Sequence, residues 1–154
     1  MTSKPLIYLD ANPFIYALEG APAISAPLKA LFETLRGQPG SAVTSELTLA
    51  EVLAPSKGRK RTPQLKRAYL DLMVWSRFIE LQPVSRGILF ETVNLRTTRA
   101  TARLKLPDAI HLATAIRSQC RFLMSGDKGI PVPRGMVHAK PDAASIANIV
   151  KELA

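Results

Sequence analysis

Four acidic residues stand where a folded chain can bring them to one edge of a sheet. Asp10 ends an apolar, strand-like stretch, and Asp127 follows another such stretch by three residues. Glu51 lies in a short helix-forming segment that follows a strand-like one, and Asp108 lies in the first turn of a predicted helix. Because the carboxyl ends of parallel strands meet at one edge of a sheet, we expect these four carboxylates to converge.

Such a cluster of carboxylates favours the binding of a hard divalent cation. Carboxylates a few ångströms apart repel one another, and Mg²⁺ or Mn²⁺ relieves that repulsion because both ions prefer oxygen ligands. A water held by such an ion can lose a proton and attack phosphorus, and a second ion about 4 Å away can stabilise the leaving oxygen. The four acids therefore predict metal-dependent hydrolysis of a phosphate ester, with Mg²⁺ or Mn²⁺ as the cofactor.

Each acid also has a purely structural explanation. Asp10 could cap the helix that follows it, although Asn12 already suits the capping position. Thr48 and Glu51 have the spacing of a capping box, and Asp108 would be stabilised by the helix macrodipole without any function. The fourth acid could belong to a glycine-containing turn. We favour one shared cause, since it explains four coincidences on the same predicted edge.

The charge of the chain supports a substrate that carries phosphates. Its 154 residues include 21 lysines and arginines against 12 aspartates and glutamates, which gives a net charge of +9. No acidic residue occurs in 52–70 or in 92–107, so basic residues gather there and favour a polyanionic partner. The alternative is a solvated face or a docking surface for an acidic protein. The predicted nucleic-acid contacts are Lys57, Arg59, Lys60, Arg61, Arg96, Arg99 and Arg103.

Strand and helix signals alternate along the whole chain. Apolar, strand-forming segments occur at 6–9, 42–44, 78–81, 121–124 and 136–138, the last as an edge strand. Helical segments separate them, including one that begins near Pro27 and a long one over 85–104. This alternation predicts a three-layer α/β fold, in which helices flank a central and mostly parallel sheet. The length predicts a single domain over 1–154.

The composition excludes several other classes of protein. Hydrophobic residues make up 47% of the chain and charged residues 21%, so disorder, collagen and coiled coil are excluded as the main organisation. The single cysteine, Cys120, excludes an internal disulfide and a cysteine-based zinc site. No apolar run is long enough for a membrane span or a secretory signal, so we expect a cytoplasmic protein that does not associate with membranes.

Four short stretches resemble, in the right order, the motifs of the PIN-domain nucleases, and most closely the VapC-type toxins of toxin–antitoxin pairs. They are 8–16, 48–53, 106–115 and 124–128, and the third is the most specific of them. The resemblance implies a PIN fold and endoribonuclease activity on cellular RNA with Mg²⁺ or Mn²⁺. It also implies a VapB-type antitoxin that inserts a segment at the active site, and a homodimer.

The same motifs assign roles to individual residues. They imply that Glu51, rather than Glu46, is the acid of the second motif. They place Asn12 and Ser125 close to the metal ligands, where both would orient ligands or water. The chain departs from the family pattern at Ala11, where threonine or serine is common, and at 129–130, which replaces an aspartate–phenylalanine pair. The implied metal ligands are Asp10, Glu51, Asp108 and Asp127.

Two other functions are consistent with parts of the pattern. A haloacid-dehalogenase-like phosphatase would use Asp10 as nucleophile, but it needs an aspartate at the position of Asn12 and room for a cap domain. A non-catalytic PIN-fold domain that only binds RNA would gain nothing from acids clustered opposite phosphate. We interpret His111 as a polar residue at the edge of the core rather than a general base.

Overall fold

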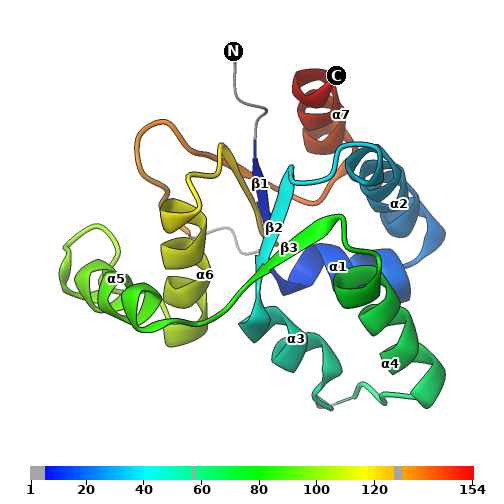
Figure 1. The fold of residues 1–154 in the computed structure, drawn as a ribbon, viewed down its shortest axis with the longest axis horizontal. Coiled ribbons are helices and arrows are strands. Elements are labelled where there is room, and N and C mark those ends of the chain that lie inside the picture. Colours follow the sequence, from blue (N-terminus) through cyan, green and yellow to red (C-terminus); the bar gives the residue numbers. More distant parts are fainter. Residues whose placement is uncertain (1–5, 57, 127–129) are drawn as a thin grey trace.

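Five strands form one parallel sheet in the computed structural model, which describes residues 6–56, 58–126 and 130–154 (Figure 1). The strand order is β3-β2-β1-β4-β5, and every adjacent pair runs parallel. The predicted α/β fold with a parallel central sheet is therefore confirmed. The strands are β1 (Ile7–Leu9), β2 (Ala42–Ser45), β3 (Ile79–Gln82), β4 (Phe122–Met124) and β5 (Val137–Ala139).

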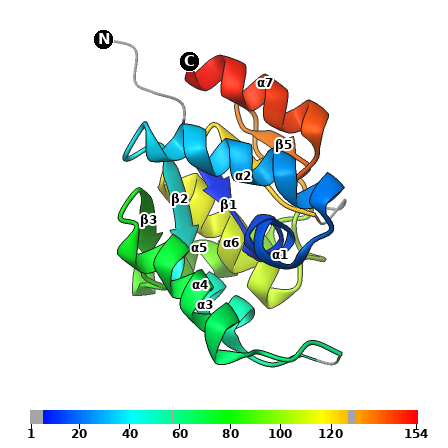
Figure 2. The ribbon, with the colours of Figure 1, turned by 90° about the vertical axis from the view of Figure 1, so that its right-hand side faces the viewer.

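Helices cover both faces of this sheet. One face carries α1, α2, α4 and α7, while α6 packs on the other face with α5 outside it (Figures 1 and 2). No helix within the described residues is both long enough and apolar enough to cross a membrane. The helices are α1 (Ala11–Glu19), α2 (Pro22–Arg36), α3 (Glu46–Leu53), α4 (Pro63–Leu70) with its π-helical continuation (Asp71–Trp75), α5 (Arg86–Thr97), α6 (Leu106–Arg117) and α7 (Ala143–Leu153).

The central strand β1 is buried on both faces. Ile7 and Leu9 face the core that α1, α2 and α7 close, whereas Tyr8 faces the core beneath α6. This alternation follows from the two-residue period of a strand. Leu9 pairs with Met124 of β4, so the residues that follow β1 and β4 leave the sheet at the same edge. The register therefore places Asp10 and Ser125 side by side along that edge.

Helix α2 begins at Pro22, five residues before the predicted start at Pro27. Pro22 occupies the first helical position, where a missing N–H removes no hydrogen bond. Pro27 lies inside the helix, which continues because Leu28 and Leu31 belong to a continuous buried face. Burial of this face outweighs the local penalty of an internal proline.

Helix α5 ends at Thr97 rather than near Leu104, as the sequence had suggested. The Thr97 and Thr98 hydroxyls both donate to the Asn94 carbonyl, at 3.0 and 2.7 Å. Threonine side chains that bond the backbone in this way compete with helical hydrogen bonds. The segment from Thr98 to the start of α6 therefore forms turns, and these turns carry exposed basic residues.

Candidate active site

Asp10 caps the first helix and is almost completely buried. It follows β1 directly, and its Oδ1 accepts a hydrogen bond from the backbone N–H of Asn12 at 2.9 Å. The sequence had favoured Asn12 for the capping position, but α1 begins at Ala11 and Asn12 is already helical. The side chain is only 6% exposed. Capping thus fixes the orientation of this carboxylate at the edge of the sheet.

Burial raises the pKa of Asp10 to about 6. The hydrogen bond from Ser125, the nearby His111 and the Asn12 N–H oppose this rise, while the Glu51 carboxylate adds to it. At neutral pH the ionised Asp10 is therefore a poorly hydrated anion close to a second acid. A cation at this position would stabilise the pair.

Glu51 lies on α3 and contacts a buried histidine. His111 Nε2 is 2.5 Å from Glu51 Oε1, and the Glu51 side chain is 31% exposed. The capping-box explanation for Glu51 is wrong, because Ser45 caps α3 by accepting from the Leu47 N–H. Thr48 lies inside the helix. Glu51 therefore has no role at the start of its own helix and extends toward α6 instead.

His111 connects Glu51 to the central strand. Its Nδ1 is 2.6 Å from the Tyr8 hydroxyl, and the histidine is 2% exposed. Burial, with the Asp10 and Glu51 charges, raises the pKa of Tyr8 well above its ordinary value, so the phenol keeps its proton. We infer that the phenol donates to Nδ1 and that Nε2 carries the proton that is donated to Glu51.

Sequence reasoning placed His111 at the edge of the core and missed this contact. One signal could have indicated it. His111 follows Asp108 by three residues, which places both on similar faces of one helix. A histidine on the same helix face as a candidate metal ligand is well placed to orient another ligand through its ring.

Ser125 and Asn12 both lie beside Asp10. Ser125 follows β4, is fully buried and donates a hydrogen bond to the Asp10 carboxylate. The Asn12 amide approaches Gly126 so closely that a Cβ on that glycine would lie 2.6 Å from Asn12 Nδ2. The structure therefore places both of these predicted residues around Asp10.

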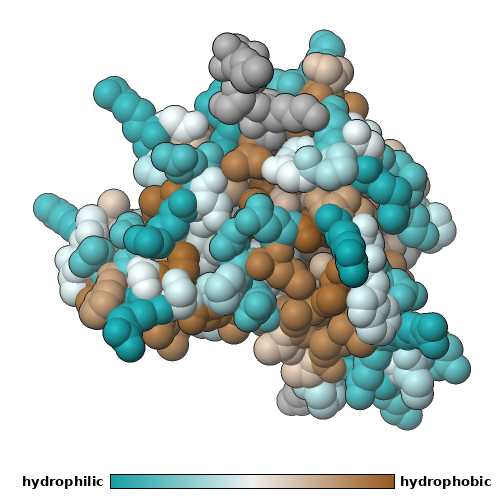
Figure 3. Space-filling model, in the orientation of Figure 1, coloured by the Kyte–Doolittle hydropathy of each residue, from teal (hydrophilic) through white to brown (hydrophobic). Residues whose placement is uncertain are grey.

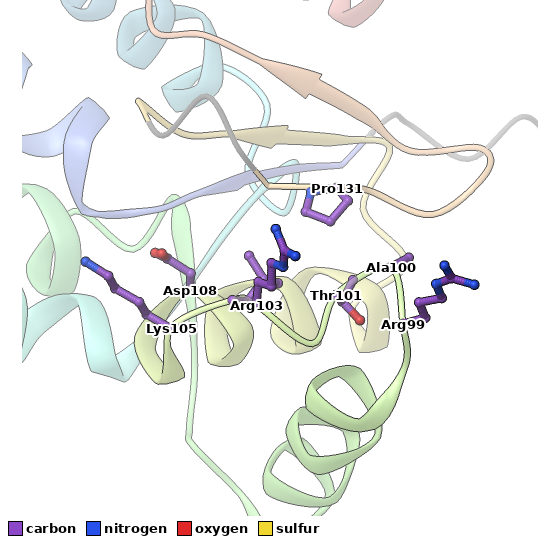
Figure 4. Close-up of a pocket in the computed structure, with 8 residues that line it drawn as sticks. Arg99, Ala100, Thr101, Arg103, Lys105, Asp108 and Pro131 are labelled. Carbon is purple, nitrogen blue, oxygen red and sulfur yellow. The ribbon is translucent and has the colours of Figure 1, made fainter.

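Asp108 lies in the first turn of α6, one turn before His111. It lines a pocket with Lys105 and Arg103, which Figure 4 shows beside it. Asp127, the predicted fourth ligand, falls outside the described residues. Within the described part of the chain, no group of three or more Asp, Glu, His and Cys side chains is arranged to hold a metal ion. Convergence of all four acids remains a prediction.

One predicted nucleic-acid contact, Arg61, has a different role. Its side chain is 1% exposed, its Nε donates to the Val52 carbonyl at 2.6 Å, and its Nη1 pairs with Glu19 at 3.2 Å. Arg59 and the Tyr69 hydroxyl also contact Glu19, so the basic loop is tied to α1. A buried guanidinium presents no surface to a phosphate, so we withdraw Arg61 as a contact.

The other basic residues divide by their exposure. Arg59 is half-buried against Glu19, and Lys57 falls outside the described residues. The predicted contacts that are exposed to solvent are Lys60, Arg96, Arg99 and Arg103. These four therefore remain candidates for contact with a polyanion.

Comparisons with known proteins identify the family. A sequence model of the PIN domain matches residues 7–134, and the chain belongs to the PIN domain family. The predicted resemblance to VapC-type PIN proteins is confirmed, and membership of this family rejects the haloacid-dehalogenase-like alternative. A search of curated proteins found no match.

Two solved structures share the fold. A toxin–antitoxin complex from Klebsiella pneumoniae is 26% identical, with a TM-score of 0.62, over 88% of this chain and 97% of that one. VapBC2 from Rickettsia felis, bound to a DNA fragment from its promoter, is 21% identical, with a TM-score of 0.63. That match covers 88% of this chain and 98% of the other. The sheet and helices described above are thus an arrangement that known toxin–antitoxin structures also contain.

Proposed function

We propose that this protein is a metal-dependent endoribonuclease and the toxin of a VapBC-type toxin–antitoxin pair. The observation that carries the proposal is the pair of acids, buried Asp10 and partly exposed Glu51, each held by a side chain from another element. Ser125 holds Asp10 and His111 holds Glu51. Membership of the PIN domain family supports hydrolysis of nucleic acid as the class of reaction.

The donor atoms at this edge of the sheet fit Mg²⁺ or Mn²⁺. Asp10 and Glu51 offer carboxylate oxygens, Ser125 adds a hydroxyl, and hard divalent ions prefer such ligands. Asp10, Glu51, Asp108 and Asp127 would hold the ion. When bound, it supplies an activated water and neutralises charge on the phosphate.

The surrounding residues have separate tasks in this proposal. Asn12 and Ser125 keep Asp10 in one orientation, and His111 does the same for Glu51. The exposed bases Lys60, Arg96, Arg99 and Arg103 bind RNA phosphates and fix the position of the strand. The cellular RNA substrate implies that the protein acts in the cytoplasm.

Protein partners are supported by exposed apolar surface. Figure 3 shows hydrophobic surface where α1, α3 and α4 meet, next to the helix that carries Glu51. We propose that a VapB-type antitoxin covers this surface, because the two solved structures reported above are, by their descriptions, a toxin–antitoxin complex and VapBC2. Helix α5 also exposes Leu89, Phe90 and Val93 on one face, which we propose as the homodimer contact.

The test is cleavage of a single-stranded RNA by the purified chain with Mn²⁺, and with chelator. We expect internal cleavage that requires Mn²⁺ and falls by about 10³-fold or more in Asp10→Asn and Asp108→Asn. Asp71→Asn, which changes an exposed aspartate on another helix, serves as the matched control and should cleave normally. RNA binding without metal-dependent cleavage would instead support the non-catalytic PIN-fold alternative.

A further inference from the structure

A pocket of about 330 Å³ opens directly beside Asp108. It lies between the turns that follow α5, the start of α6 and Pro131. Figure 4 shows Lys105 and Asp108 at one end, Arg103 nearer the middle and Arg99 at the other end. In this view Lys105 lies on one side of Asp108, whereas Arg103 and Arg99 follow one another along the pocket on the other side.

The three cations are available for a ligand. Arg99, Arg103 and Lys105 are exposed, and none of the ion pairs between described residues involves them. This differs from Arg59 and Arg61, which both form ion pairs with Glu19. Helix α6 begins at this pocket with Lys105 as its cap residue and without a side-chain cap, so its dipole adds positive potential there.

We propose that this pocket carries the RNA backbone past the cleavage point, with Arg103 and Arg99 contacting successive phosphates on one side of Asp108 and Lys105 contacting the strand next to Asp108. The inference rests on the proposed function, because Asp108 marks the cleavage point only if it is one of the ligands of the hydrolytic ion. Guanidinium groups suit phosphate through paired N–H donors, and lysine contributes a point charge. The described residues that line the pocket include no aromatic side chain, so we expect the pocket to contact the RNA backbone rather than stacked bases.

An acidic segment of a protein partner is the competing ligand for these cations. The position of the pocket favours RNA, because Asp108 is both a lining residue and a candidate ligand of the hydrolytic ion. A strand whose scissile phosphate lies at Asp108 must continue past the neighbouring basic residues.

The test measures binding of a short single-stranded RNA of mixed sequence by fluorescence anisotropy. The Asp10→Asn background and a chelator prevent cleavage, so the result does not depend on activity. We expect Arg99→Gln with Arg103→Gln to weaken binding by at least about tenfold. The slope of log K against log salt should fall by roughly 1.4, since each lost contact to a single strand contributes about 0.7.

The matched control is Lys66→Gln with Arg67→Gln, which removes the same charge from exposed positions on α4. Equal loss of affinity in the pocket and control variants would overturn the proposal, because net charge would explain both. Unchanged RNA affinity with lost binding of an acidic peptide would also overturn it and assign the pocket to a protein partner. Thermal unfolding of each variant identifies loss of affinity that is due to misfolding.

Failure of this proposal is distinguishable from failure of the proposed nuclease activity. RNA binding that depends on Arg99 and Arg103, without Mn²⁺-dependent cleavage by the unsubstituted protein, would support the proposed pocket and reject the nuclease. Cleavage that depends on Asp10, together with RNA affinity that does not depend on Arg99 and Arg103, would support the nuclease and reject RNA binding in this pocket.

Discussion

His111 Nε2 lies 2.5 Å from Glu51 Oε1, at the end of a buried chain of polar groups that begins at the Tyr8 hydroxyl. The contact joins α6 to α3, and Tyr8 anchors both to the central strand. A histidine fixed on its far side by a phenol can hold a carboxylate in a single orientation. This series of contacts from Tyr8 through His111 to Glu51 is therefore the clearest preorganised feature of the candidate site.

Replacing His111 should weaken metal binding and also destabilise the fold. We expect His111→Ala to reduce Mn²⁺ affinity by about 10–100-fold, because Glu51 loses the group that orients it. Titration calorimetry measures this directly, without RNA. The freed Tyr8 hydroxyl should also lower the free energy of unfolding by about 1–3 kcal/mol.

The protonation of the ring gives an independent check of the same contact. ¹⁵N NMR should show His111 in the Nε2–H form, since Tyr8 donates to Nδ1. Tyr8→Phe, which leaves the contact with Glu51 intact, should reduce Mn²⁺ affinity less than His111→Ala does. A ring protonated at Nδ1 alone, or an equal loss of Mn²⁺ affinity in both variants, would contradict the proposed hydrogen bonds from Tyr8 to His111 and from His111 to Glu51.

The stability of the protein should depend on pH through Asp10. The pKa of Asp10 is about 6 in the folded protein, against an ordinary value of 3.8, so the folded state holds this proton more tightly than the unfolded chain does. The stabilisation from that proton is complete below pH 3.8 and is lost as the pH rises through 6. Asp10→Asn should therefore stabilise the protein at pH 7.5, by on the order of 2–3 kcal/mol.

Urea unfolding between pH 4 and 8 measures this difference. The gain in Asp10→Asn should shrink toward pH 4, and Mn²⁺ should stabilise the original protein but not the variant. Asp71→Asn provides the control, because this aspartate is exposed. A stability difference that stays constant with pH would show that the buried charge is not its cause.

Gly126→Ala should displace the Asn12 amide. The new methyl group would lie 2.6 Å from Asn12 Nδ2, and this flexible side-chain end can move without unfolding the backbone. We therefore expect a clear fall in cleavage rate with a change in unfolding free energy below about 1 kcal/mol. Cleavage kinetics together with thermal unfolding separate the two effects.

The comparison with Asn12→Ala makes this test specific. If Gly126 acts only through Asn12, the double variant should be no worse than the worse of the two single variants. Gly37→Ala is the matched control, since its new methyl group would make only an ordinary 3.5 Å contact. Additive losses in the double variant would show that Gly126 has a separate role.

Arg61 should contribute to stability rather than to RNA binding. Removing it leaves the Val52 carbonyl without this donor, while Glu19 keeps Arg59 and Tyr69, so Arg61→Ala should cost on the order of 1–3 kcal/mol in chemical denaturation. Lys60→Ala, at the neighbouring exposed position, should leave stability unchanged and weaken RNA binding instead. The reverse pattern would restore Arg61 as a contact for nucleic acid.

The sequence by itself determined the order and type of most elements. Alternating apolar stretches predicted all five strands, and Pro107 correctly indicated that Asp108 lies in the first turn of a helix. These features depend on which side of a helix or strand is buried, and the spacing of apolar residues in the sequence shows that side directly. Local pattern failed where local forces compete, as at the internal Pro27 of α2 and the threonines that end α5.

Only the tertiary structure decided which side chains meet. Glu51 and His111 are 60 positions apart, and Arg61 and Glu19 are 42 apart. The same basic loop therefore looked like a surface for RNA, although one of its arginines is buried. Periodicity assigns a residue to one face of its own element, whereas contact between elements depends on how those faces pack against each other. For this reason the candidate acids were visible in the sequence, but the contact through which His111 orients Glu51 was not.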